Sequence, residues 1–241
     1  MILTSLIDII RHTREVHSSW NTTQKPWFRG EPESGTPVLP KLFRKSWQKT
    51  EHQIVQEFRS KGPVYGLNPI PRENNNEWLF LMQHTGAPTR LLDWCEGLMV
   101  ALFFALHEEN PILWMMNPNQ LNRIAGLVLP ENNYPICWGN EASPAHKNIQ
   151  APFREGQGAI EYPIAFIPTY IHPRMASQKS VFTVHGSKPI SLASIDGFSQ
   201  IEKISISPDH RHDVLDELDF CGISYSSIFP DYDGLGKEYG T

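Results

Sequence analysis

A block of polar side chains directly precedes the most apolar stretch of the chain. The sequence reads LMQHTGAPTRLLDWCEGLMVALFFAL from Leu81 to Leu106. Its His84, Thr89, Arg90 and Asp93 are residue types that hydrogen-bond a sugar, clamp an anion or exchange a proton. A Gly-Ala-Pro segment before Thr89 breaks the preceding helix and predicts a loop, and binding residues are often found on such loops. The block is therefore a candidate site.

The same residues also have a structural interpretation. Asp93 and Glu96 have the spacing of a capping box, which predicts Asp93 as the N-cap of a helix from Cys95 to Glu108. Arg90 would then form a salt bridge to Asp93 or Glu96 instead of binding a ligand. The two interpretations can hold together, since a cap can also face a site.

Two further stretches add polar candidates. WFRGE places Arg29 at the end of a short aromatic segment, and Gly30 lets a backbone or a ligand approach closely. The planar guanidinium of Arg29 suits a phosphate or carboxylate ligand. Alternatively, Arg29 forms a buried ion pair that anchors the strand. In PRMASQKSVFTVHG, Gln178 precedes a strand-like run, where it contacts a ligand or satisfies the strand end.

The elements that must position these residues are short and of both kinds. Helical patterns predict helices at Ser5–Val16, Trp47–Arg59, Glu77–His84 and Cys95–Glu108, and after Ser207-Pro208 as far as Gly222. Strands are predicted at Trp27–Gly30, Ile112–Met116, Gly126–Leu129, Ile164–Tyr170, Val181–His185, Ile201–Ile206 and Ser224–Phe229. We therefore expect one α+β domain over residues 1–241, with a helix-rich N-terminal half and a strand-rich C-terminal half.

Composition excludes several classes of protein. The 21 Lys and Arg against 26 Asp and Glu give a net charge of -5, so no global basic field indicates nucleic-acid binding. The longest apolar run is too short to span a bilayer, and three scattered cysteines suit a reducing compartment, so we expect a cytoplasmic protein without membrane contact. No Walker, dinucleotide-binding or nucleophile-elbow pattern occurs, and the ten histidines lack metal-ligand spacing, so no metal is expected.

The order of these motifs resembles the FRG domain, named for the Phe-Arg-Gly found here at residues 28–30. The resemblance runs from Pro26 to the C-terminus, after a helical extension over about residues 1–25. The matching positions are Arg29, Gly30, Gln83, His84, Gly86, Thr89, Arg90, Leu92, Asp93, Trp94, Ala101, Ala105 and Gln178. The family usually has a Gly close after the Gln, where this chain has Lys179-Ser180, and a Thr or Ser after the Trp, where it has Cys95.

The FRG outline is similar to that of ADP-ribosyltransferases, which implies a split sheet and NAD as substrate. Under this resemblance Arg29 grips phosphate beside Gly30, His84 and Thr89 hydrogen-bond the ribose or carboxamide, and Arg90 is a second phosphate clamp. A carboxylate must stabilise the oxocarbenium-like transition state, and a neutral Gln178 can only orient a hydroxyl. Asp93 is favoured for that role, and the alternatives are Glu31, Glu155 and Glu161.

The resemblance also implies partners and a setting. The acceptor of ADP-ribose is expected to be nucleic acid, RNA preferred, and the protein a toxin in a bacterial toxin-antitoxin or anti-phage defence system, with a possible antitoxin partner. The aromatic and basic stretches Lys41–Lys49 and Tyr170–Lys179 are candidates for the acceptor contact. The alternative function is a non-catalytic module that binds a nucleotide or a protein, and a hydrolase is the third possibility.

Overall fold

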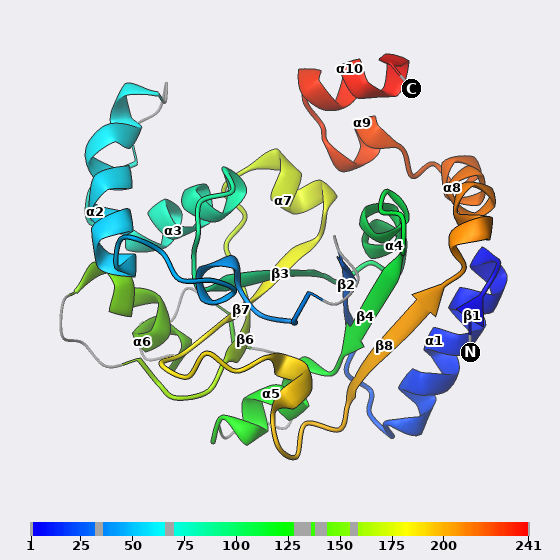
Figure 1. Ribbon diagram of the computed structural model, residues 1–241, viewed down its shortest axis with the longest axis horizontal. Helices are drawn as coiled ribbons and strands as arrows, with labels where there is room; N and C mark the ends of the chain where they lie inside the picture. The colour runs from blue at the N-terminus through cyan, green and yellow to red at the C-terminus, as the bar shows by residue number, and fades with distance from the viewer. Residues whose placement is uncertain are drawn as a thin grey trace.

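The computed structural model of the chain describes residues 2–31, 36–65, 70–127, 136–137, 144–154 and 159–240. These residues form one mixed sheet of eight strands with helices packed against it (Figure 1). The strand order is β1-β8-β4-β2-β3-β7-β6-β5. The expected α+β class is confirmed. Within these ranges no helix is long and apolar enough to cross a membrane.

The strands run antiparallel through the centre of the sheet and parallel at its edges. They are β1 (Ile2–Leu3), β2 (Trp27–Glu31), β3 (Leu91–Cys95), β4 (Ile112–Met116), β5 (Ile136–Cys137), β6 (Ile164–Ile167), β7 (Ser180–Val184) and β8 (Ile201–Ile206). The parallel pairs are β1 with β8 and β5 with β6. The predicted strands at β2, β4, β7 and β8 are confirmed within one or two residues.

The helices are α1 (Leu6–Ser19), α2 (Glu51–Lys61), α3 (Asn75–His84), α4 (Leu98–Leu106), α5 (Pro118–Ile124), α6 (Pro144–Gln150), α7 (Pro173–Ser177), α8 (Arg211–Phe220), α9 (Tyr225–Ile228) and α10 (Tyr232–Gly240). One strand prediction is wrong, because residues 224–229 contain α9. Ser224 and Ser227 form a capping box there, and the resulting hydrogen bonds favour a helical turn. Half of the strand expected at 126–129 lies outside the described residues, and Gly126 and Leu127 are not in a strand.

The helix predicted from Cys95 begins later, and Asp93 does not cap it. Leu91–Cys95 is strand β3, paired with β7 along its whole length, with Asp93 opposite Phe182. Helix α4 begins after Gly97, which makes no side-chain cap. Leu91, Leu92 and Trp94 pack on both sides of the sheet. That packing outweighs the local preference of Asp93 for the N-cap of a helix.

Alternation along β3 places Asp93 between two halves of one apolar layer. Leu91, Asp93 and Cys95 point to the same face of the sheet. Leu91 packs with α3 and α6, while Cys95 packs with α1, α4 and α8. Leu92 and Trp94 point to the opposite face, into a third cluster with α5. Asp93 therefore stands in the gap between the two groups of helices.

Gly30 allows α4 to lie directly on β2. A Cβ added to Gly30 would meet the carbonyl oxygen of Ala101 and the amide nitrogen of Ala105, each at 2.5 Å. Ala101 and Ala105 are themselves completely buried. Three small residues on two elements thus set the spacing between helix and sheet, and fix one wall of the gap above Asp93.

The two central strands separate beside this gap. Strand β2 pairs with β4 at five positions but with β3 only at Phe28 and Cys95. The sheet is thus weakly joined between β2 and β3, with Gly30 and Asp93 on either side of the opening.

Candidate functional site

Two adjoining hollows above β3 bring together residues from distant parts of the sequence. Their volumes are about 400 and 350 Å3, and we call them the first and second compartments of the crevice. Phe80, Met175 and Phe182 give the first an apolar wall. Arg29 and Phe229 line the second. The residues shared by both are Gln83, His84, Asp93, Arg174, Gln178 and Ser180.

Asp93 is the carboxylate at the junction of the two compartments. Its side chain rises from the middle of a hydrogen-bonded strand into the gap between helices, where solvent still reaches it. Desolvation by the surrounding protein raises the pKa of Asp93, while the charge of Arg29 and a hydrogen bond from Gln83 oppose that rise. A carboxylate held in this way suits proton exchange or the stabilisation of a cationic intermediate.

A hydrogen-bonded chain fixes the groups around Asp93. The Thr89 hydroxyl donates to Oε1 of Gln83, and Nε2 of Gln83 donates to Oδ2 of Asp93. Thr89 also accepts from the backbone N–H of Leu91 at 3.2 Å. The orientation of the Gln83 amide, and with it the donor to Asp93, is therefore set by Thr89.

Arg29 is oriented toward the same carboxylate. One terminal nitrogen of its half-buried guanidinium donates to the backbone oxygen of Asp93 at 2.8 Å. The same guanidinium lines the second compartment. It is thus held beside Asp93 by a bond to a neutral backbone oxygen, and its remaining nitrogens suit an anionic ligand.

Residues 24–112 of this chain match the family model of the FRG domain. The chain contains an FRG domain. No curated protein and no solved structure matches the chain. The match includes Arg29, Gln83 and Asp93 and ends before α7, so the part of the crevice that carries Gln178 lies beyond it.

Gln178 lines both compartments of the FRG crevice from the end of α7. Its Nε2 donates to the Ile228 carbonyl at 3.4 Å. The next residue, Lys179, has φ of +48°, in the left-handed region that favours glycine. This chain adopts the turn with lysine, at the place where the resemblance to the FRG domain led us to expect a nearby glycine.

Thr89 and Arg90, expected to contact the ligand, are not among the residues that line the crevice. Thr89 is only 1% exposed and reaches the site through Gln83 alone. Arg90 pairs with both carboxylate oxygens of Glu51 on α2 and donates to the backbone oxygen of His185. The expected partners Asp93 and Glu96 are not used, because β3 directs Asp93 away from this buried ion pair.

The alternative carboxylates are placed elsewhere or not described. Glu31 is 2% exposed, accepts from Trp114 on the opposite side of the sheet and has a pKa raised by burial. Glu161 forms a surface pair with Lys188 at 3.1 Å, and Glu155 lies outside the described residues. Burial also raises the pKa of Cys95 to about 12, which keeps that thiol protonated at neutral pH. In the described ranges no group of His, Cys, Asp and Glu could hold a metal ion.

Sequence reasoning missed three residues of the crevice. His172 and Arg174 flank the start of α7, and Phe229 follows α9. The clue for the first two was the HPRMASQ run before Gln178, since a short helix that ends at a site residue also places its other end nearby. Phe229 gave no comparable signal, because its position depends on the fold of the C-terminal segment.

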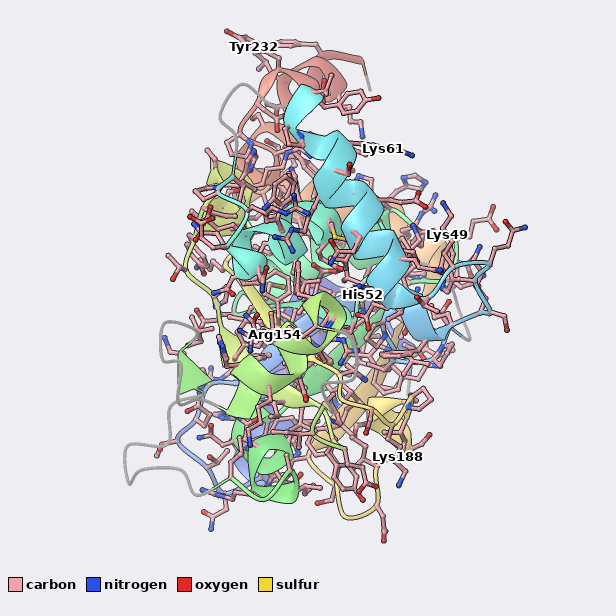
Figure 2. All side chains as sticks on the ribbon, turned by 90° about the vertical axis from the view of Figure 1, so that its left-hand side faces the viewer. Lys49, His52, Lys61, Arg154, Lys188 and Tyr232 are labelled. Atoms are coloured by element: carbon pink, nitrogen blue, oxygen red, sulfur yellow. The ribbon has the colours of Figure 1, made fainter. Side chains whose placement is uncertain are left out.

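A larger hollow of about 900 Å3 is lined by residues of α2 and α3 and contains none of the expected site residues. Trp47, Ile54 and Phe58 line it, and Figure 2 shows Lys49 and Lys61 near opposite ends of α2 on this surface. The stretch Lys41–Lys49, considered for nucleic acid, borders this hollow and not the crevice. The Tyr170–Lys179 stretch does reach the crevice, through His172 and Gln178.

Proposed function

We propose that this FRG protein binds NAD in the crevice and transfers ADP-ribose to a macromolecular acceptor. The observation that carries the proposal is the placement of Asp93 at the junction of two compartments, one apolar and one lined by Arg29. NAD joins a flat, positively charged nicotinamide ring to a diphosphate through a ribose. With the nicotinamide in the first compartment and the diphosphate toward Arg29, the bond between the ribose and nicotinamide would lie over the carboxylate of Asp93.

The chemistry assigned to Asp93 follows from its charge. Cleavage of the bond between the ribose C1′ and nicotinamide releases neutral nicotinamide and leaves an oxocarbenium-like centre. An ionised Asp93 stabilises that positive charge, and it can then accept the proton that the acceptor group gives up as the new bond to C1′ forms. The raised pKa of Asp93 moves it toward the range in which a carboxylate is an effective base.

The surrounding residues orient this reaction. Gln83 donates to one oxygen of Asp93 and thereby leaves the other oxygen for the ribose. Arg29, fixed against the backbone of the same residue, is placed to hold a phosphate. Gln178 lines both compartments, where its amide would orient a ribose hydroxyl. The weak joint between β2 and β3 is also what a split sheet of the transferase type would require.

The acceptor is proposed to be nucleic acid, with RNA preferred. The part of the chain best placed to meet it is Tyr170–Lys179, where Tyr170 and Ile171 are each 42% exposed beside the crevice. An exposed aromatic ring next to basic side chains offers a base a stacking face and a phosphate a partner. The role as a toxin rests on the resemblance alone.

The decisive experiment uses NAD labelled in its adenylate part. The purified protein is incubated with RNA, DNA or cell protein in separate reactions, and label transfer and nicotinamide release are both followed. Transfer to one acceptor, lost in Asp93→Asn, is the expected result. Binding of NAD without nicotinamide release would overturn the proposal in favour of the non-catalytic module. For the toxin role, induction should arrest bacterial growth, and Asp93→Asn should relieve that arrest.

A further inference from the structure

Arg90, expected as a second phosphate clamp, is not among the residues that line the crevice. Arg90 is buried against Glu51, and one nitrogen of Arg29 is already bonded to the backbone of Asp93. A diphosphate carries more than one negative charge, so Arg29 alone leaves it undercompensated. Other cationic or cation-forming groups must face the ligand if the crevice is to hold it.

Two imidazoles lie in contact beside the first compartment. The ring centroids of His84 and His172 are 4.5 Å apart, with an angle of 39° between their planes. Both residues are exposed and line the first compartment. Nδ1 of His172 accepts from the backbone N–H of Arg174 at 3.2 Å, so a proton on its neutral ring resides on Nε2. The second nitrogen is thus a donor for a ligand.

Arg174 borders the same compartment and is held in place by the C-terminal segment. Its Nε donates to Asp231, and its guanidinium lies 5.1 Å from the Phe229 ring centroid. That hydrogen bond lowers the pKa of Asp231 to about 2, so Asp231 stays ionised at any working pH. The side chain of Arg174 is 23% exposed and borders both compartments, so its guanidinium can meet a ligand at their junction while it is paired with Asp231 and lies 3.8 Å from Asp233.

The surroundings of His84 disfavour a charge on its imidazole. Desolvation lowers the pKa of His84, and the positive charges of His172 and Arg174 lower it further, against smaller opposing effects of Asp231 and Asp93. At neutral pH His84 therefore stays neutral while the crevice is empty. An anion placed between these groups reverses the balance, because it stabilises a proton on either ring.

We propose that His84, His172 and Arg174 form a phosphate-binding wall that takes the diphosphate of the ligand with uptake of one proton from solvent. Naming the ligand's diphosphate rests on the proposed function, whereas the anion site itself rests on the geometry of the three side chains. The diphosphate then lies where the two compartments join, between these side chains and Arg29 in the second compartment.

Inorganic pyrophosphate is the probe that separates the two ideas, since it requires no transfer chemistry. Its binding is measured by calorimetry between pH 6 and pH 8.5, in two buffers with different heats of ionisation. Because pyrophosphate itself gains and loses protons in this range, the same titrations are run on His84→Gln, and the difference between the two proteins reports the wall. Proton uptake by the wall predicts that this difference includes a buffer-dependent heat and an affinity advantage of the wild type that falls as pH rises, by up to about tenfold per pH unit. A difference that is independent of both pH and buffer would overturn the proton uptake.

His172→Asn is the informative variant, because asparagine keeps an acceptor for the Arg174 N–H while it removes the imidazole. The expected result is at least about tenfold weaker pyrophosphate binding, equal to about 1.4 kcal/mol, with an unchanged melting temperature. The control, His212→Gln, changes an exposed histidine on α8 that is not among the residues lining the crevice, and should bind as wild type. Equal binding by wild type and His172→Asn overturns the wall.

The two proposals can fail separately. If NAD is cleaved normally but pyrophosphate binding ignores His172→Asn, the phosphate wall is wrong and the transferase stands. If pyrophosphate binds as expected but no nicotinamide is released from NAD, the wall stands and the transferase is wrong.

Discussion

Replacement of Glu51 by glutamine tests whether Arg90 anchors the fold. Nε of Arg90 donates to Oε1 of Glu51 at 2.8 Å, a terminal nitrogen donates to the other oxygen, and the two side chains are only 9% and 14% exposed. Removal of one partner from a buried ion pair costs about 3–5 kcal/mol, because the remaining charge stays buried without compensation. For a chain of this size each kcal/mol lowers the melting temperature by about 2–4 °C. Glu51→Gln should therefore lower it by roughly 6–20 °C.

The assay is thermal unfolding followed by circular dichroism, with a control on the same helix. Glu57 pairs with Lys49 at the surface, where its side chain is 44% exposed, so Glu57→Gln should melt with the wild type. A double replacement, Glu51→Leu with Arg90→Met, should recover much of the loss, since both buried charges are removed together. An Arg90→Met protein that melts normally but no longer binds pyrophosphate would refute this reasoning and restore Arg90 as a ligand clamp.

Three other substitutions give separate tests. Gly30→Ala places a Cβ 2.5 Å from the backbone of α4 and should cost about 1–3 kcal/mol, seen as a lower melting temperature, whereas Gly236→Ala, with open space around it, should not. Thr89→Val removes the donor to Gln83, so unfolding in urea should show a loss of about 1–3 kcal/mol, and an unchanged midpoint would contradict that hydrogen bond. Asp93→Asn should raise the melting temperature at neutral pH, because the raised pKa of Asp93 means that folding disfavours its ionised form. That gain should disappear as pH falls through the raised pKa toward the unfolded value of 3.8, and destabilisation at pH 7 would show that Asp93 is structural.

The strands could be predicted wherever an apolar run coincided with alternation, as in β2, β4, β7 and β8. Prediction failed at β3, where the LLDW sequence carries a charge in the middle of a strand and is followed at once by an apolar helix. A carboxylate at that position looks like a helix cap when only neighbours in sequence are considered. Its true environment depends on β7, which is almost ninety residues away in the chain.

The candidate site could also be predicted only in part, because the local sequence identifies residue types but not their distant partners. Residue type and the nearby ends of helices and strands identified four of the site residues. The fold brings these four, Arg29, His84, Asp93 and Gln178, to one crevice. The error at Arg90 arose because its partner Glu51 is on a helix that the sequence gives no reason to place there. His172 and Arg174 were missed because their role depends on contact with α3 and with the C-terminal segment.

The polar residues before the apolar helix serve one purpose, which is to hold Asp93 in the open gap of the sheet. Thr89 orients Gln83, Gln83 donates to Asp93, and Arg90 ties the connecting loop to α2. This arrangement does not stabilise the fold at Asp93 itself, since the pKa of that carboxyl is raised and its ionised form is disfavoured. A chain that retains a destabilising charge and supports it with a buried network fits a reactive carboxylate better than a structural one. The stability of Asp93→Asn at neutral pH therefore bears on function as directly as its activity does.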